Sequence, residues 1–425
     1  YLWNNLDLVA KEENGDVLND SYYTRNSYLK DTYNVNIGVL FCGQTSVSTT
    51  GSEMYKFIQK SVMSGDSEFD AIISSPYDSI GYAMTDLVLD LKTLEYLNLD
   101  KPWWDQNARR ELVFGNRTYV VTGDLTVVNA KATQSIIFNK PLSEMYELDN
   151  HYDIVKSGKW TLDRFIENSK RVSTDLDGND KRNENDRFGY ISWQDDGSFF
   201  LYSTDNSYGI INSSGKPELT LYSERSVNVW EKLISFIESE AVFSMKFDTD
   251  LLKGRNNLEI IDYMFTGNHA LYCWAPIGNV LNLRSSDADF GILPPPKYDE
   301  NQENYVSPAG SFGNAMLTVP VTTSDPERTG YVLEAFAAKS SEIVKPAFYE
   351  KTLVGKSTRD DESIEMLDIL FATKRYDIGN FFMWGNLTNK VMEAWNKKDP
   401  NFTSMYDGAK SAALEDVAKI EKLFE

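Results

Sequence analysis

The chain has 425 residues, of which 41% are hydrophobic and 25% charged, and its formal net charge is −22. This length is too great for one core and fits two domains of ordinary size, and the composition is that of a globular protein. The acidic balance argues against nucleic acid as a partner, because phosphate binding needs clustered Lys and Arg. No apolar run approaches the roughly 20 residues that span a bilayer.

Catalytic and metal-binding motifs are scarce. The two cysteines, Cys42 and Cys273, and the two histidines lie in no spacing typical of a metal site, a redox site or a catalytic triad. The two cysteines could form a disulfide or remain two buried thiols. Nine Trp and 24 Tyr are present. Most aromatic residues must lie in cores, but exposed rings beside Asp, Asn and Gln suit sugars, which present flat C–H faces and hydroxyl groups.

The amino-terminal part predicts alternating helices and strands. A helix is expected over 21–35 with its cap at 19–21, then a strand at Val35–Phe41, a helix over 51–69, a strand at Asp70–Ser75 and a further helix over 76–91. This alternation predicts an α/β fold with a largely parallel sheet, in which ligands bind at the carboxyl ends of strands. Tyr77 follows one such end.

Two stretches predict crossings between two lobes. β-rich runs at Tyr119–Thr122 and Ser135–Phe138 flank a small polar segment, and three consecutive prolines stiffen the stretch FGILPPPKY at Phe290–Tyr298. Two crossings form a hinge with the ligand between the lobes. The expected amino-terminal lobe comprises 1–125 and 303–342, the carboxyl-terminal lobe comprises 126–302 and 343–425, and the crossings lie near 123–133 and 290–305.

The sharpest local motif is STDLDGNDKRNENDRFGY, which has the spacing of a calcium loop. Its ligands at positions 1, 3, 5, 7, 9 and 12 would be Asp175, Asp177, Asn179, the Lys181 carbonyl, Asn183 and Asp186. Two residues differ from the EF-hand pattern: Asp180 replaces the glycine at position 6, and Asp186 replaces glutamate. Asp tolerates the left-handed backbone that position 6 requires. A structural Ca²⁺ ion is therefore expected, the alternative being an acidic turn without metal.

Several aromatic and polar residues are candidates for ligand binding. Trp274 lies at a predicted strand end before a Pro and a Gly, and replacing it with Ala is expected to abolish binding with little loss of stability. The other aromatic candidates are Trp104, Tyr77, Trp193 and Trp384. Hydrogen bonds to ligand hydroxyl groups are expected from Asp105, Asp124, Asp195 and the backbone of Gly310 and Ser311.

The order of these features resembles a known family. FDAIISSPYDSIGYA, YLNLDKPWWDQNA, YVVTGD, SIIFNK, GKWTLDRF, the Asp-rich loop with FGY, and GNHALYCWAP together resemble the extracellular solute-binding proteins of ABC importers. The closest group is the sugar-binding type found as lipoproteins in Gram-positive gut bacteria. The succession GKWT, DxDGN, FGY is the most specific part.

The resemblance implies a type II periplasmic-binding-protein-like α/β fold, in which two lobes close over a mono- or oligosaccharide. It further implies a non-enzymatic monomer on the outer face of the cytoplasmic membrane, which delivers its cargo to permease subunits. The family's first core strand and lipid-bearing Cys are not evident, so the chain is expected to start downstream of both.

Two other functions remain open from the sequence. A secreted glycoside hydrolase needs two carboxylates about 5–10 Å apart, and 64 acidic residues always provide a pair. The same fold could also bind a peptide, a polyamine or another solute.

Overall fold

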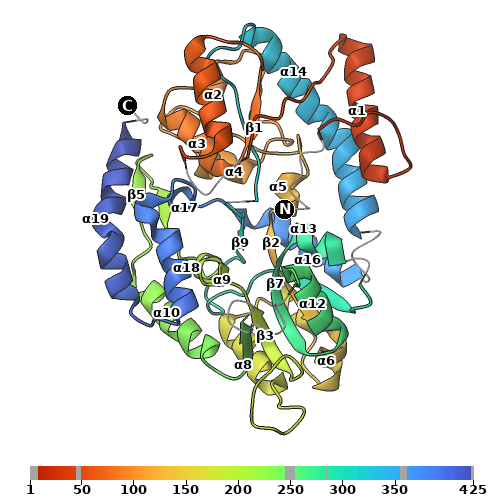
Figure 1. Cartoon of the computed structure of the whole chain (residues 1–425), viewed down its shortest axis with the longest axis vertical. Coiled ribbons are helices and arrows are strands. Elements are labelled where there is room, and N and C mark those ends of the chain that lie inside the picture. Colours follow the sequence, from red (N-terminus) through yellow and green to blue (C-terminus); the bar gives the residue numbers. More distant parts are fainter. Residues whose placement is uncertain are drawn as a thin grey trace.

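The computed structural model describes residues 8–44, 49–244, 254–283, 286–311, 313–354 and 361–422. Two groups of elements lie one above the other in Figure 1. The first lobe surrounds a two-stranded sheet of β1 (Ile72–Ser74) and β10 (Met316–Thr318), and the second lobe surrounds a five-stranded sheet. No helix among these residues is long and apolar enough to cross a membrane.

In the first lobe, β1 pairs antiparallel with β10, and Ile72 lies opposite Thr318. The helices of this lobe are α1 (Val17–Tyr33), α2 (Glu53–Ser64), α3 (Pro76–Met84), α4 (Gln106–Glu111) and α14 (Pro326–Lys339). The Ser52 side chain caps α2, which ends at Gly65 in the left-handed conformation. The expected cap of α1 at 19–21 is wrong, because Asp16 accepts the first amide hydrogens.

The sheet of the second lobe has the strand order β6-β3-β7-β2-β8. Its strands are β2 (Gln134–Asn139), β3 (Phe188–Ser192), β6 (Val242–Ser244), β7 (Ala270–Pro276) and β8 (Phe290–Leu293). β3 runs parallel to β6 and β7, whereas β2 runs antiparallel to β7 and β8. The sheet is therefore mixed. In the first lobe, whose alternating elements predicted a largely parallel sheet, the strand pair β1 and β10 is antiparallel, so that expectation is wrong for these strands.

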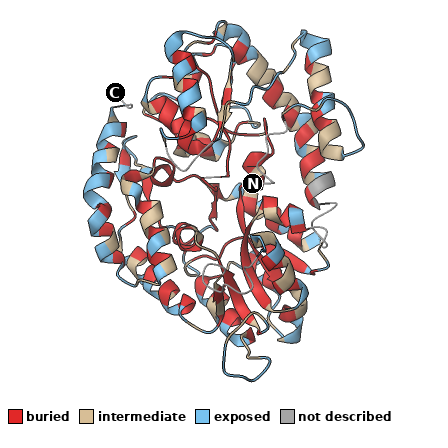
Figure 2. Ribbon diagram, in the orientation of Figure 1, coloured by how far each residue is buried: buried red, intermediate tan, exposed pale blue. Residues whose placement is uncertain are grey.

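Side chains of β2 pack alternately on the two faces of this sheet. Ile136 and Phe138 belong to one core cluster and Ile137 to another. Figure 2 shows the resulting buried centre of the lower half. The helices around the sheet are α6 (Lys140–Met145), α7 (His151–Lys156), α8 (Leu162–Val172), α12 (Asn257–Thr266), α13 (Ile277–Asn282) and α16 (Asp361–Ala372).

A further group of elements flanks both lobes on the left of Figure 1. It comprises α9 (Asp196–Ser203), α10 (Glu224–Ile237), α17 (Ile378–Phe381), α18 (Leu387–Lys397), α19 (Phe402–Glu421) and the hairpin of β4 (Gly209–Ile211) and β5 (Pro217–Leu219). Trp230 of α10 is fully buried in this group.

The GKWT segment leads into α8. The Thr161 side chain caps α8, and Trp160 before it is fully buried and donates its indole N–H to the Pro294 carbonyl. Both cysteines are free: Cys273 is buried and Cys42 half-buried.

Two expected features have a different structure. Val35–Phe41 forms no strand, because no neighbouring strand among the described residues pairs with it. Phe290–Leu293, expected at the second crossing, is β8, an edge strand of the five-stranded sheet. The chain therefore leaves that sheet after these residues.

Candidate functional site

Three segments run side by side where the lobes meet. Thr133 and Ala309 form an antiparallel bridge between the segment after α5 (Val128–Lys131) and the chain beyond β9 (Ser307–Pro308). β9 also pairs in parallel with β11 (Lys374–Arg375). This junction positions the side chains described next.

Asp105 lies in a buried polar network at this junction. It caps α4, and its carboxylate lies 2.9 Å from Lys374 Nζ and accepts hydrogen bonds from Tyr376 Oη and Asn129 Nδ2. Burial by itself would raise the pKa of the Asp105 carboxyl, but the Lys374 charge and the Ala108 amide hold it below its usual value. This carboxylate is thus engaged within the protein, and its expected role as a ligand-binding residue stays a prediction.

The other end of α4 is held by the same segment of chain. Glu111 forms an ion pair with Arg375, and its second carboxylate oxygen accepts the backbone N–H of Tyr376 at 2.6 Å. Residues 374–376 therefore bind both ends of one helix of the first lobe. No pattern in the sequence pairs these distant segments.

A separate group of residues, four of them predicted from the sequence, meets between α3 and the strand ends of the second lobe. We call Tyr77, Gln134, Asp195, Phe199, Trp274 and Ser311 the junction group. The Tyr77 hydroxyl lies 2.7 Å from Ser311 Oγ, and both side chains are buried. Burial raises the pKa of Tyr77 to about 12, and the nearby Asp195 charge adds to that rise. Asp195 therefore approaches Tyr77 from the second lobe.

Trp274 is the aromatic centre of the junction group. It lies near the end of β7, is 5% exposed, and donates its indole N–H to Gln134 Oε1 at 3.0 Å. Phe199 stacks on it with ring centroids 5.5 Å apart. Gly310 lies beside the same glutamine, since a Cβ atom there would stand 3.0 Å from Gln134 Nε2. The sequence analysis missed Gln134 and Phe199, although both adjoin stretches that it singled out.

Trp193 and Asp196 brace the turn that carries Asp195. The half-buried Trp193 follows β3, and its backbone N–H donates to Asp196 at 2.6 Å. Asp196 also accepts the Tyr190 hydroxyl, and burial raises the pKa of Asp196 to about 8. This buried carboxyl group fixes the direction in which Asp195 emerges.

Three other candidates lie outside the junction group. Trp104 is 1% exposed in the core of the first lobe, where its indole N–H donates to Glu334. Trp384 is fully buried, and a Cβ atom at Gly209 would lie 2.0 Å from its ring. Asp124 pairs with Lys345 at 3.1 Å. Both tryptophans are packed in core clusters, and their expected role as ligand platforms stays a prediction.

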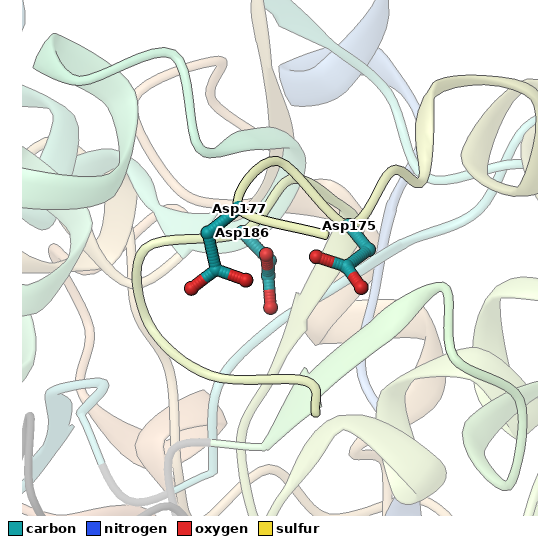
Figure 3. Close-up of side chains that lie close together, drawn as sticks. All are labelled: Asp175, Asp177 and Asp186. Atoms are coloured by element: carbon teal, nitrogen blue, oxygen red, sulfur yellow. The ribbon is translucent and has the colours of Figure 1, made fainter. Parts of the chain in front are cut away.

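The predicted calcium loop brings three carboxylates together. Asp175, Asp177 and Asp186 each offer an oxygen, and these atoms all lie within 4.8 Å of one another; Figure 3 shows the three groups converging. Asp186 is fully buried and accepts backbone N–H groups from Leu176 and Asn183. The arrangement can hold a metal ion.

The backbone of this loop has the conformation that the motif requires. Asp180, at position 6, has φ of +60°, the left-handed conformation for which an EF-hand uses glycine. Asp175 accepts the amides of Asp180 and Gly178, and these bonds, the Asp180 amide foremost, hold its pKa below the usual value. The loop is therefore wound around its carboxylates by its own hydrogen bonds.

No protein-family model matches the chain, and no curated protein matches it either. Solved structures do match it over nearly the full length, and they establish the fold. The chain has the mixed α/β fold of type II periplasmic-binding-protein sugar-binding proteins.

Three neighbours illustrate the likeness. UgpB from Mycobacterium tuberculosis in complex with glycerophosphocholine is 14% identical over 93% of this chain and 95% of its own, with a TM-score of 0.62. A sugar transporter from Rhizobium etli in an open conformation is 12% identical over 96% and 97%, with a TM-score of 0.61. A cyclo/maltodextrin-binding protein complexed with maltotetraose is 13% identical over 96% and 94%, with a TM-score of 0.60.

Proposed function

We propose that this chain is the substrate-binding component of an ABC importer and that it captures a mono- or oligosaccharide between its two lobes. The observation that carries the proposal is the likeness over nearly the full chain to solved structures whose names include sugar and maltodextrin binders. The protein acts as a receptor without catalysis.

The junction group supplies the chemistry that a sugar requires. Trp274 and Phe199 form an aromatic pair able to stack on the C–H face of a ring. Tyr77, Ser311 and Asp195 offer hydroxyl and carboxylate groups for ligand hydroxyls. Because Trp274 is 5% exposed here, ligand access requires the lobes to separate about the junction, which is the hinge motion of two-lobe binding proteins.

The proposal includes the expected division of the chain, with crossings near 123–133 and 290–305. The partners are permease subunits, and the receptor works on the outer face of the cytoplasmic membrane as a lipid-anchored monomer. It does not bind nucleic acid.

We also propose that the Asp175–Asp186 loop binds Ca²⁺. Three carboxylates, two asparagine side chains and the Lys181 carbonyl form an all-oxygen donor set, which suits this hard cation with its six to eight ligands. The ion would brace the loop between α8 and β3 and take no part in ligand binding. Its affinity would be that of extracellular modules, roughly 10⁻⁴–10⁻³ M.

One neighbour favours a second class of cargo. UgpB was solved in complex with glycerophosphocholine, so the same fold serves a ligand that is not a sugar. In this chain, Asp195 could pair with the cationic group of such a solute.

A thermal-shift screen tests the proposed cargo. A ligand that binds only the folded state raises Tm by mass action. At a free ligand concentration of one hundred times Kd, the free energy of unfolding increases by about 2.7 kcal/mol. A shift with one series of mono- or oligosaccharides is the expected result. A shift with glycerophosphocholine, a peptide or a polyamine would replace the sugar. Release of shorter sugars from an oligosaccharide panel would overturn the receptor and point to a hydrolase.

A further inference from the structure

The side chain of Gln134 lies between two groups that need opposite hydrogen-bonding partners. Its Oε1 accepts the indole N–H of Trp274 at 3.0 Å, and its Nε2 donates to the Ala132 carbonyl at 3.2 Å. An indole can only donate a hydrogen bond, and a carbonyl can only accept one. A carboxamide satisfies both groups at once, whereas an ionised Glu has no donor and an apolar side chain has neither group. The residue type at this position therefore fits both bonds.

Gln134 reaches Trp274 because the two side chains lie on one face of the five-stranded sheet. β2 runs antiparallel to β7, and Ile136 lies directly opposite Trp274. Side chains alternate along a strand, so Gln134, two residues before Ile136, is a diagonal neighbour of Trp274 on the same face. Gln134 is itself buried, and Phe199 stacks on one face of the indole ring. The bond from Gln134 therefore holds the edge of a ring that has one face left for a ligand.

The Ala132 carbonyl connects Gln134 to the segments that run side by side where the lobes meet. Besides the Gln134 amide, this carbonyl accepts the backbone N–H of Gly310 at 3.1 Å. The approach is close, since a Cβ atom at Gly310 would lie 3.0 Å from Gln134 Nε2 and 3.2 Å from the Ala132 oxygen. A displacement of the chain around Gly310 relative to Ala132 therefore disturbs the Gln134 carboxamide.

The residue after Gly310 extends these contacts into the first lobe. Ser311 Oγ lies 2.7 Å from the Tyr77 hydroxyl of α3, and both side chains are buried. Trp274, by contrast, lies on β7 of the second lobe. A series of buried contacts thus runs from one lobe to the aromatic ring of the other, and Gln134 is its last member before Trp274.

We propose that Gln134 is a positioning residue, which holds the Trp274 ring in place for stacking on a ligand and makes that placement depend on how the two lobes meet. The inference rests on the proposed function, because it takes Trp274 as the ligand platform. Lobe separation changes the backbone of the segments that join the lobes. This change displaces the Ala132 carbonyl from the Gln134 amide, and the indole ring is then no longer held.

The proposal has a consequence for ligand capture. A ligand that stacks on the positioned Trp274 ring binds the closed arrangement better than the open one, and so it shifts the population towards closure. The effect is reciprocal: whatever weakens the contact between Gln134 and Ala132 also weakens the binding of that ligand. Gln134 therefore couples the platform to closure.

The test uses the whole chain and no ligand. NMR of the ¹⁵N-labelled protein follows hydrogen exchange of the Trp274 indole N–H, whose signal is assigned by its loss in Trp274→Phe. Gln134→Met keeps a side chain of similar length without the carboxamide, and it should speed this exchange about tenfold or more, because exchange reports local opening. The Trp160 indole N–H, which donates to the Pro294 carbonyl, is the internal control and should keep its rate in a folded variant.

A second variant guards against loss of folding. Gln134→Asn keeps the carboxamide but is one methylene too short to reach both partners. It should speed exchange of the Trp274 indole N–H as Gln134→Met does, with the Trp160 signal again unchanged. An unchanged exchange rate at Trp274 in both folded variants would overturn the proposal.

Gly310→Ala perturbs the same contact from the other side. Its added Cβ atom crowds Gln134 Nε2, so it should speed exchange of the Trp274 indole N–H severalfold. In the double variant with Gln134→Met the exchange should be no faster than in Gln134→Met alone, since the connection is already lost. Tyr77→Phe, which removes the hydroxyl that contacts Ser311, should show the same dependence on Gln134.

The double variants separate coupling from a purely structural role. If Gly310→Ala and Tyr77→Phe speed the exchange equally with Gln and with Met at position 134, Gln134 carries no coupling and the proposal is wrong. The result is also distinct from that of the cargo screen. A screen without a sugar response, together with the expected exchange rates, would replace the sugar and leave Gln134 as the positioning residue of the platform.

Discussion

Lys374 and Asp105 form a buried ion pair, 2.9 Å between Nζ and the carboxylate, that joins β11 to the amino-terminal end of α4. The residues are 269 positions apart in the sequence, and their side chains are only 6% and 13% exposed. With Asn129 and Tyr376 they form the polar centre of the lobe junction. The pair therefore links the first lobe to the segments that cross beneath it.

We predict that Lys374→Met destabilises the protein by about 3 kcal/mol, because it leaves the Asp105 carboxylate buried without its cation. Urea unfolding measures the loss. Replacing both residues, as Lys374→Met with Asp105→Leu, should recover part of it, since no charge is then left unpaired. Lys345→Met is the control: its pair with Asp124 is more exposed and should be worth at most about 1 kcal/mol. Equal losses in the two single variants would contradict this prediction.

Trp274→Ala should cost both stability and ligand affinity. Trp274 packs in a core cluster, and replacing a core Trp with Ala costs about 3–5 kcal/mol. We therefore expect a large loss of stability, whereas the sequence alone suggested a small one. Trp274→Phe keeps an aromatic ring but removes the indole N–H that Gln134 accepts. Urea unfolding and calorimetric titration should show a smaller stability loss for Phe than for Ala, with weakened binding in both. Unchanged binding in Trp274→Ala would assign Trp274 to the core alone.

Millimolar Ca²⁺ should raise Tm, and EDTA should reverse the rise. Asp177 is exposed, so Asp177→Asn should abolish this difference and leave the calcium-free Tm nearly unchanged. Asp186→Asn should lower Tm even in EDTA, because the buried Asp186 carboxylate accepts two backbone amides. Identical Tm with Ca²⁺ and with EDTA, and no heat in calorimetry, would leave an acidic turn without metal.

Stability should fall in mild acid because of His151. Burial lowers the pKa of His151 to about 3, whereas an unfolded chain takes up this proton near pH 6.5. The unfolded state therefore binds more protons between about pH 6.5 and 3, and stability falls by about 1.4 kcal/mol per pH unit in that window. His151→Phe should flatten the slope by this amount, and His269→Phe is the control. A slope unaffected by His151→Phe would contradict the assignment.

Gly123→Ala should destabilise the contact between the segments around Gly123 and Trp103. A Cβ atom at Gly123 would lie 2.2 Å from the Trp103 carbonyl oxygen, so the two backbone segments must move apart. We expect a loss of about 1–3 kcal/mol, typical of overpacking. Gly408→Ala, on an open face of α19, should be neutral or slightly stabilising, since Ala is the better helix former. Thermal unfolding of the two variants makes the comparison.

The sequence by itself determined the local features. The calcium-loop spacing and the strand predicted at Ser135–Phe138, which the structure has as β2, follow from contacts within a few residues or from the period of one element. The order of motifs also predicted the fold that the solved structures share. Such features are readable because their physical causes lie close together along the chain.

Only the tertiary structure decided which distant groups meet. Asp105 had the residue type of a ligand-binding group, but Lys374 engages it from 269 positions away. Trp104 and Trp274 were both candidate aromatic platforms, yet one packs inside the first lobe and the other stacks on Phe199 at the junction. Whether Val35–Phe41 forms a strand likewise depends on a neighbour. Pairing, burial and charge compensation across the chain are set by packing, and the local sequence does not encode them.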